Sequence, residues 1–486
     1  MTELTVYAPM LPEIVVAIGA MALLMFGAFR RDAEGRDFVC SWLAIAVLLV
    51  AAGVLAFAPP ERAVLFEGAF IADDFARFMK LLILAGAALV LVMSFGGLSR
   101  AKLLSFEYAV LLLLSVLGMM LMVSAGDLIA LFLGIELQSF ALYVIAAIDR
   151  EKVRSSEAGL KYFVLGSLSS GMLLYGCSLI YGFTGAIEFS AIAAAAQGVA
   201  PAENLGLTIG LVFLLVGLAF KVSAVPFHMW TPDVYEGAPT PVTAFFAAAP
   251  KLAAMALMLR VLLGAFPGIA DQWQQIVVFL SVASMLLGAF AAIGQSNIKR
   301  LMAYSSIGHV GYALIGLAAH SEAGTQSVLV YLAVYLFMTV GAFACILAMQ
   351  GKDGMHEDIG SLSGLAKNNL PMAFVLAMIL FSMAGIPPLA GFFAKFYVFA
   401  AAIDAKLYAL AVVGVLASVV AAYYYLRVVK VMFFDDAQEA FLPVERGTGL
   451  VMTISGLFVL LFVLLPEPLI NAAKTAAQAL HAAPGQ

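Results

Sequence analysis

The sequence predicts an all-α polytopic membrane protein that forms a single membrane domain over residues 1–486. Of the 486 residues, 64% are hydrophobic and only 11% are charged, and the mean hydropathy is +1.06. These values lie far outside the range of soluble proteins. About twenty apolar residues are needed to cross the hydrocarbon core of a bilayer. The chain offers about fourteen such segments, which are separated by turn or charged residues.

The expected spans follow one another along the whole chain. The first carries Pro9, Pro12 and Glu13 and no basic region precedes it, so we expect a permanent span and not a cleaved signal peptide. Residues 1–105 hold the first three spans, and 447–467 form the last. The expected centres are Ala20, Leu48, Ala87, Leu114, Gln138, Gly171, Val216, Ala254, Met285, His309, Leu336, Ile379, Leu416 and Leu457.

The Lys and Arg residues predict the orientation of these spans. Fifteen fall in loops after odd-numbered spans, Lys299 among them. Six fall in loops after even-numbered spans or in the tail, Lys80 and Arg260 among them. Because cytoplasmic loops carry an excess of Lys and Arg, we expect both termini on the periplasmic side of a bacterial inner membrane.

Four charged residues stand alone inside apolar stretches: Glu136, Lys221, Lys251 and Lys395. A charge at the bilayer centre costs at least ~2.5 kcal/mol on insertion scales, so each is a functional-site hypothesis. Lysine is a point charge on a flexible stem, and a buried lysine can take up and release a proton. The pattern therefore predicts ion movement.

Two spans are interrupted. One covers 218–230 and contains Pro226; the other covers 385–395 and contains Pro387 and Pro388. A broken helix leaves backbone groups that need protein or water partners. A pair of discontinuous helices in the two halves of a chain is typical of a transporter-type ion site.

The two halves of the chain predict internal repeats. A shift of roughly 160 to 175 residues superposes the two broken spans and brings Glu136 near the polar stretch 304–309. Residue identity under this shift is poor, and the prolines follow the lysine in one span but precede it in the other. The repeat is therefore a hypothesis.

Two motifs carry a resemblance to a known family. The segment 226–243, PFHMWTPDVYEGAPTPVT, resembles a signature of the antiporter-like proton-translocating membrane subunits. The segment 297–309, NIKRLMAYSSIGH, resembles a second signature of that family. The WTPDVY wording, the terminal Lys395 and the lack of a long lateral helix after the fourteenth span are similar to members that belong to bacterial NADH:quinone oxidoreductase, respiratory complex I. The resemblance covers nearly the whole chain.

The resemblance implies a fold, a function for this chain and a set of cofactors that bind to other subunits. The fold would be two inverted five-helix repeats, 106–266 (spans 4 to 8) and 272–433 (spans 9 to 13), each with one broken helix. The chain would translocate protons as a subunit of a translocase enzyme, within the lipid bilayer. NADH, FMN, iron–sulfur clusters and quinone would bind to partner subunits. Those partners would include neighbouring antiporter-like subunits.

The family's relay residues carry over one at a time. Glu136 matches the glutamate of the fifth span, and Lys221 matches the lysine of the first broken helix. The resemblance implies that these two form a gating pair. Lys251, which directly follows Pro250, matches the central lysine, and Lys395 matches the terminal lysine.

Four further residues are secondary relay candidates, and each has an ordinary structural alternative. Lys161 lies close to the charged loop 150–157, and a lysine near a span end commonly extends to the membrane interface. His309 and His228 are lone histidines in a bundle, and such residues are more often hydrogen-bonded core residues than relay groups. Tyr304 either lines a water path or bridges helices.

Other functions find less support in the sequence. A subunit of a multisubunit monovalent cation/proton antiporter is the main alternative, and a structural subunit that has lost transport is a second. Idle charges in hydrocarbon only destabilise, which argues against the second. Cys40, Cys177 and Cys345 are scattered singly, so no metal or catalytic redox centre is expected in this chain. Nothing predicts nucleic-acid binding.

Overall fold

The computed structural model describes residues 3–30, 33–58, 62–197 and 205–482, and it is an all-α membrane protein. Twelve helices in the described part are long and apolar enough to cross a membrane. All fourteen expected centres lie in helices. Two of them, Ile379 and Leu457, lie in the shorter apolar helices α16 and α19, because both of these spans are interrupted.

The first region contains three long helices and a small hairpin. Asp73 is the N-cap residue of the third helix, and its carboxylate accepts a hydrogen bond from the Ala76 amide. The elements are η1 Glu3–Met10, α1 Leu11–Phe29, α2 Ala33–Phe57, β1 Ala63–Leu65, η2 Phe66–Gly68, β2 Phe70–Ala72 and α3 Asp74–Arg100. The two strands pair antiparallel, with Val64 opposite Ile71.

The second and third regions each hold five helical segments of the expected length, and the fourth segment of each is broken. The second region comprises α4 Phe106–Ser124, α5 Leu128–Ala146, α6 Val153–Thr184, α7 Phe189–Ala196, α8 Leu205–Val222, α9 Trp230–Gly237, α10 Thr240–Ala247, α11 Ala249–Ala265 and η3 Pro267–Ile269. The third comprises α12 Ala270–Ile293, α13 Ile298–Ala318, α14 Glu322–Leu347, β3 Gln350–Gly351, β4 Gly354–Met355, η4 Ile359–Leu362, α15 Leu365–Asn368, α16 Leu370–Ala384, α17 Ala390–Asp404 and α18 Tyr408–Phe434.

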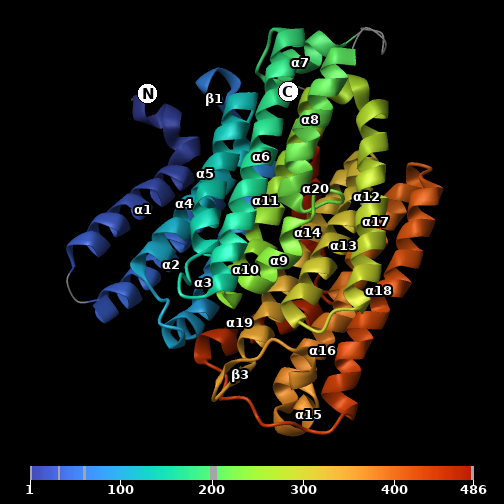
Figure 1. The fold of residues 1–486 in the computed structure, drawn as a ribbon. Coiled ribbons are helices and arrows are strands. Elements are labelled where there is room, and N and C mark those ends of the chain that lie inside the picture. The colour runs from blue at the N-terminus through green and yellow to red at the C-terminus, as the bar shows by residue number, and fades with distance from the viewer. Residues whose placement is uncertain (1–2, 31–32, 59–61, 198–204, 483–486) are drawn as a thin grey trace.

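The chain ends in two helices, α19 Arg446–Leu461 and α20 Glu467–His481. The expected last span, 447–467, covers α19 and the break that follows it. Helix α20 then packs against α3 and α14. The N- and C-terminal ends lie at the same end of the molecule (Figure 1), as an even number of crossings requires.

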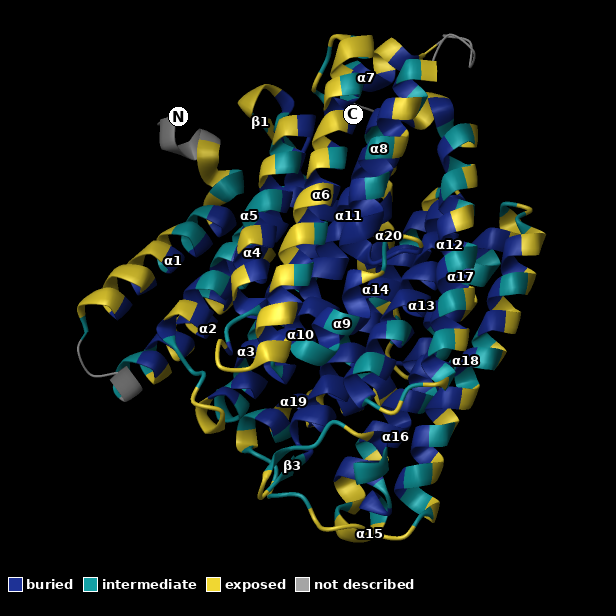
Figure 2. Cartoon of the chain, in the orientation of Figure 1, coloured by how far each residue is buried: buried dark blue, intermediate teal, exposed yellow. Residues whose placement is uncertain are grey.

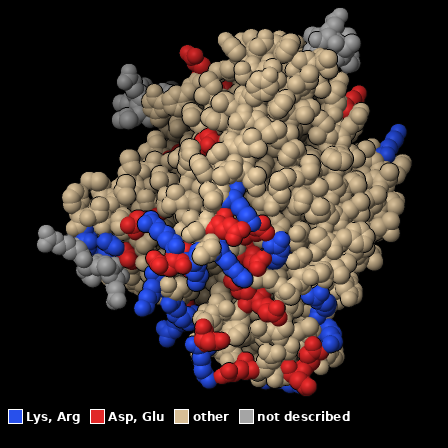
Figure 3. All heavy atoms as spheres, viewed as in Figure 1, with Lys and Arg blue, Asp and Glu red and all other residues tan. Residues whose placement is uncertain are grey.

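The helices differ in how deeply they are buried. Helices α10, α11, α13 and α14 are buried nearly all round and form the centre, whereas α1, α6 and α18 expose apolar faces (Figure 2). A helix that is hydrophobic on all sides belongs in a core. The charged side chains gather at the end opposite the termini, and the other end is mostly uncharged on the face shown in Figure 3.

The assignment of Lys80, Arg260 and Lys299 to loops is wrong. All three lie in helices, and they are only 1%, 3% and 2% exposed. Each has a carboxylate partner from a distant part of the chain. Long-range pairing therefore buries charges that the sequence alone places at the surface.

Candidate functional site

The first broken helix places Lys221 in the interior. Helix α8 ends at Val222, Ser223 has a positive φ of 66°, and the Val225–Pro226 peptide is cis. The Trp230 indole donates to the Phe220 carbonyl at 3.1 Å and so satisfies a backbone group near the break. The break also contacts the second half of the chain, because the Val225 amide donates to Ser284 Oγ at 2.9 Å.

Lys221 forms a hydrogen bond with Ser139 of α5, and Glu136 lies one helical turn from Ser139 on the same helix. Lys221 Nζ donates to Ser139 Oγ at 2.6 Å, and it lies 5.7 Å from the centre of the Tyr143 ring. Glu136 Oε1 accepts a hydrogen bond from Ser170 Oγ at 2.5 Å. Among the described residues no ion pair within 4.0 Å joins Glu136 to Lys221. The two groups are therefore neighbours with a serine hydroxyl beside them, and they are not in direct contact.

Lys251 lies at the start of α11, directly after a backbone irregularity. Ala248, with φ −100° and ψ −99°, separates α10 from α11. Lys251 is 2% exposed, and its Nζ donates to Ser306 Oγ on α13. Ser306 Oγ also accepts from Tyr335 Oη at 3.0 Å, and Lys251 Nζ lies 5.3 Å from the Tyr235 ring centre. The lysine is therefore surrounded by hydroxyl groups and aromatic rings.

His309 lies on α13 between the surroundings of Lys251 and those of Lys395. Its Nδ1 is 2.6 Å from Tyr331 Oη and its Nε2 is 3.1 Å from Tyr425 Oη. Two small cavities flank the imidazole. One is shared with Lys251 and the other with Lys395, and each measures about 10 Å³. That is close to the smallest volume that holds one water molecule.

The second broken helix places Lys395 next to the carbonyl that the break has freed. Helix α16 ends at Ala384, and Lys395 Nζ donates to the Ala384 carbonyl at 3.0 Å and to Ser418 Oγ at 2.8 Å. Gly385 has a φ of 90°, and a Cβ there would lie 3.0 Å from Lys395 Cδ. Glycine is therefore needed both for the left-handed turn and for the close approach of the lysine. The Pro387–Pro388 peptide is cis.

The secondary candidates lie in different surroundings. The side chain of Lys161 is 41% exposed, and its Nζ lies 2.7 Å from both Glu157 and Asp233. His228 is partly buried, and its Nδ1 has no hydrogen-bond partner among the described residues. Tyr304 is partly buried on α13, and its neighbour Ser305 is the residue that contacts Tyr425, at 2.5 Å. Of the four secondary candidates, only His309 lies between the buried lysines.

A network of charges at the end opposite the termini joins α9, which follows the first break, to α13 and to the segment before η4. Arg300 of α13 contacts Asp233 at 2.8 Å and Glu236 at 3.0 Å, both on α9. Lys299 Nζ contacts Glu357 at 2.7 Å and also donates to the backbone carbonyls of Glu236 and Ala238, at the C-terminal end of α9. The sequence motifs contain these residues except Glu357, but their pairing is visible only in the structure.

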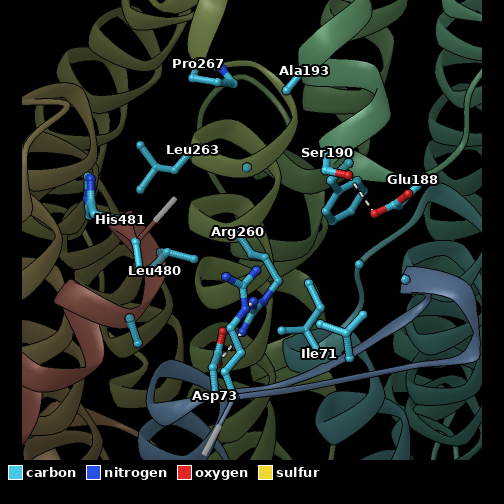
Figure 4. Close-up of a pocket in the computed structure, with 18 of the residues that line it drawn as sticks. Ile71, Asp73, Glu188, Ser190, Ala193, Arg260, Leu263, Pro267, Leu480 and His481 are labelled. Carbon is cyan, nitrogen blue, oxygen red and sulfur yellow. Dashed lines mark hydrogen bonds and ion pairs between the residues drawn. The ribbon is translucent and has the colours of Figure 1, made fainter. Parts of the chain in front are cut away.

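Two buried ion pairs lie in α3 and at its N-terminus. Lys80 Nζ is 2.5 Å from Glu13 of α1, and both side chains are about as buried as the core residues around them. Arg260 of α11 holds Asp73 through both terminal nitrogens, at 2.9 and 2.8 Å (Figure 4). Its Nε donates to the Val123 carbonyl at 2.8 Å. Sequence reasoning missed both pairs. Glu13 in the first span was the only visible signal.

The fold and the line of buried lysines define the class of protein. Residues 125–421 match the family described as NADH:quinone oxidoreductase/Mrp antiporter, transmembrane. The chain belongs to this family, as the sequence motifs indicated.

Close relatives narrow the likeness further. The chain is 58% identical over 475 residues to NADH-quinone oxidoreductase subunit N of Parvibaculum lavamentivorans, with 98% of each chain covered. It is 59% identical over 469 residues to NADH-quinone oxidoreductase subunit N 1 of Rhizobium meliloti, with 96% of this chain and 97% of the relative covered.

Solved structures share the fold. A chain of respiratory complex I from Thermus thermophilus with bound aureothin is 31% identical and superposes with a TM-score of 0.82, covering 96% of this chain and 100% of that one. A chain of the Mrp complex from Dietzia sp. DQ12-45-1b has a TM-score of 0.83 at 24% identity, covering 99% and 98%. The second likeness supports the fold alone.

Proposed function

We propose that this chain is the antiporter-like subunit N of a bacterial NADH:quinone oxidoreductase and that it translocates protons. One structural observation carries the mechanism. Lys251 and Lys395, both buried and held by neutral groups, share the imidazole of His309 through two water-sized cavities. The identity of the subunit is supported by relatives more than 50% identical that span nearly the whole chain.

Electron transfer belongs to the other subunits of the complex. NADH, FMN, the iron–sulfur clusters and quinone bind there, and this chain contributes no redox centre. Its partners are the other membrane subunits, including neighbouring antiporter-like ones. The energy of the redox reaction reaches this chain as movement at those interfaces. Moving one proton against 100 mV costs ~2.3 kcal/mol, which the rearrangement of one buried charge can supply.

The relay begins at Glu136 and Lys221. At ~4 Å and an effective dielectric near 20, opposite charges attract by about 4 kcal/mol, so approach of Glu136 would hold Lys221 protonated. In the described geometry Lys221 binds Ser139 and Glu136 binds Ser170. This is the open form of the gate, in which the proton of Lys221 is free to move on.

Hydroxyl groups and His309 carry the proton onward. A hydroxyl both donates and accepts a hydrogen bond, so Ser306 can exchange protons with Lys251. His309 accepts at one ring nitrogen and donates at the other, which suits it to pass a proton from the Lys251 cavity to the Lys395 cavity. Lys395 is the hand-over point at the second break. His228, Tyr304 and Lys161 have no part in this route.

The charge distribution supports the expected orientation. Lys, Arg, Asp and Glu gather at the end opposite the termini (Figure 3). Positively charged loops mark the cytoplasmic side. The charged end therefore faces the cytoplasm, and both termini face the periplasm across the inner membrane.

Matching close approaches support the inverted repeats, 106–266 and 272–433. A Cβ at Gly118 would lie 2.5 Å from the Gln138 amide nitrogen and 2.9 Å from the Gly134 carbonyl oxygen. A Cβ at Gly288 would lie 2.7 Å from the Gly308 nitrogen and 2.8 Å from the Tyr304 oxygen. The same helix pair thus packs backbone to backbone in each half, at equivalent positions. Under this correspondence Ser306 takes the place of Glu136.

A monovalent cation/proton antiporter subunit is the second candidate, because the Mrp chain shares the fold over nearly its whole length. The proteins that copurify with the chain distinguish the two functions. Purification of the native chain together with NADH-oxidising activity supports the first, and purification with exchanger subunits and no redox activity supports the second.

The test of the proposed function is Lys221→Ala in the assembled complex. Protons moved per electron pair should fall, because the gate loses the group that releases the proton. The matched control is Lys367→Ala, since Lys367 is an exposed lysine whose ion pair with Asp436 is also exposed and is worth little. Full pumping by Lys221→Ala would overturn the relay.

A further inference from the structure

Each of the three relay lysines lies over the face of a tyrosine ring that comes from another helix. The distances from Nζ to the ring centre are 5.7 Å for Lys221 and Tyr143, 5.3 Å for Lys251 and Tyr235, and 4.7 Å for Lys395 and Tyr312. A cation within about 6 Å of a ring centre is attracted by the negative face of the ring. The three lysines therefore share one kind of electrostatic partner.

The three rings are buried, and other aromatic residues hold them in place. Each makes an edge-to-face contact with a ring of another helix: Tyr143 with Tyr162, Tyr235 with Phe343, and Tyr312 with Phe399. Such contacts fix the orientation of a ring as well as its position. The face that meets each lysine is therefore set by the packing of the bundle.

The lysines meet the rings and not the tyrosine hydroxyl groups. The hydroxyls of Tyr143 and Tyr235 are buried and have no hydrogen-bond partner among the described residues. The lysines donate instead to serine hydroxyls and to one backbone carbonyl. The electrostatic contact is therefore made by the aromatic face.

A ring face attracts an ammonium group far less strongly than a carboxylate does. At ~4 Å and an effective dielectric near 20, a carboxylate favours the protonated lysine by roughly a thousandfold. A ring face in a desolvated site favours it by roughly tenfold. The weaker partner stabilises the ammonium group in the apolar interior and still lets the proton leave. A ring also carries no net charge, so no buried charge is left uncompensated after the proton has gone.

The buried cations that contact carboxylates do not depend on a ring. Lys80 lies over the ring of Phe70 at 4.8 Å, and Arg260 lies over that of Phe75 at 4.9 Å. Each of these two cations also contacts a carboxylate, which is the stronger partner. In the described part of the chain, only the relay lysines are buried cations with a ring and without a carboxylate contact.

We propose that Tyr143, Tyr235 and Tyr312 take part in proton translocation as the aromatic counter-charges of the relay lysines. The face of each ring stabilises the protonated lysine, and the tyrosine hydroxyl is not required. No bond forms or breaks at the ring, because the proton arrives at and leaves from the lysine. The inference rests on the proposed function.

A series of fluorinated rings at position 312 tests the aromatic counter-charge. Tyr312 has the shortest distance to its lysine. Tyr312→Phe removes only the hydroxyl. Phenylalanines with one, two or three ring fluorines, introduced by nonsense suppression, then weaken the negative face and keep the shape of the ring. The matched control is the same series at Tyr108 of α4, which is 1% exposed and has no described Lys or Arg over its ring. Proton pumping is measured on the assembled complex.

The dependence on fluorine decides the outcome. Tyr312→Phe should pump at close to the normal rate, because the ring face remains. Each added fluorine should slow pumping further, to about tenfold with three fluorines, which corresponds to ~1.4 kcal/mol. The series at Tyr108 should leave pumping unchanged. Equal rates along the series at position 312 would overturn the inference, and so would a loss of pumping already present in Tyr312→Phe.

Lys395→Met separates failure of this inference from failure of the proposed function. If Lys395→Met loses pumping while the fluorinated series stays flat, only the aromatic counter-charge is wrong. If Lys395→Met pumps normally, the relay itself is wrong. In the Lys395→Met background the series should have no further effect on the residual pumping, because no ammonium group faces the ring. A loss that grows with fluorine in that background would overturn the inference, since the ring would then act on another group.

Discussion

Buried cations in this molecule fall into two groups with different partners. Lys80, Arg260 and Lys299 each contact a carboxylate, at 2.5, 2.8 and 2.7 Å. A buried charge with a close counter-charge is locked, because removing either partner leaves the other uncompensated. These pairs join segments far apart in the sequence and act as fixed links: Lys80 joins α3 to α1, Arg260 joins α11 to the N-cap of α3, and Lys299 joins α13 to the segment before η4.

The second group holds no such partner. Lys221, Lys251 and Lys395 donate only to hydroxyl and carbonyl oxygens among the described residues. Neutral partners compensate a buried ammonium group only partly. The protonated form of a lysine in such surroundings is therefore only weakly stabilised, and loss of the proton costs little. The comparison therefore separates structural charges from those that can change state.

The largest effect is expected when a locked pair is broken. Arg260→Met leaves Asp73 buried and unpaired, so the free energy of unfolding should fall by about 3 to 5 kcal/mol. Thermal inactivation and the yield of assembled complex measure this. The double variant Asp73→Asn/Arg260→Met removes both charges and keeps an acceptor for the Ala76 amide, so it should recover much of the loss. No recovery would mean that the pair does more than balance charge.

Removal of a lysine that has no counter-charge should affect pumping and leave stability intact. Lys395→Met eliminates a costly buried charge without orphaning a counter-charge, so the stability of the complex should be unchanged or higher. Proton pumping should fall by about tenfold or more, as the hand-over group is lost. Stability and pumping are measured on the same preparation. A variant that is destabilised as strongly as Arg260→Met would place Lys395 in the locked group.

Removal of the Glu136 charge from the gate should reduce pumping less than the loss of Lys395. Glu136→Gln keeps a hydrogen-bond acceptor for Ser170 and removes only the negative charge beside Lys221. Pumping should fall several-fold, and the matched exposed variant Glu107→Gln on α4 should have no effect. Equal pumping by both variants would show that the carboxylate charge is not needed.

The smallest predicted difference separates the two broken helices. Ser139 is the only described hydrogen-bond partner of Lys221, whereas Lys395 keeps the Ala384 carbonyl when Ser418 is lost. Ser139→Ala should therefore slow pumping by about fivefold, in line with one hydrogen bond of ~1 kcal/mol. Ser418→Ala should slow it less. The reverse order would mean that Ser418 carries the proton itself.

Hydropathy and motifs were sufficient for the fold and for the four isolated charges. The apolar segments predicted every span centre, and the prolines predicted both breaks, because these features are local in sequence. Lys80, Arg260 and Lys299 could not be found in this way. Asp73 lies 187 residues from Arg260, and no sequence window contains both.

The partners of the relay lysines also escaped prediction. Ser139, Ser306 and Ser418 are ordinary residues of membrane helices, and only the packing of helices distant in sequence brings them to the lysines. The lone His309 could not be told from a core histidine until its two tyrosine partners and the two small cavities were visible.

Lys251 provides the most direct test, because it is buried, lies at the centre of the chain and has no counter-charge among the described residues. Lys251→Met in the reconstituted complex, with protons moved and NADH oxidised recorded together, should show fewer protons per electron pair or a joint fall of both rates, with the complex still assembled. An assembled complex with unchanged turnover and an unchanged proton-to-electron ratio would contradict the relay.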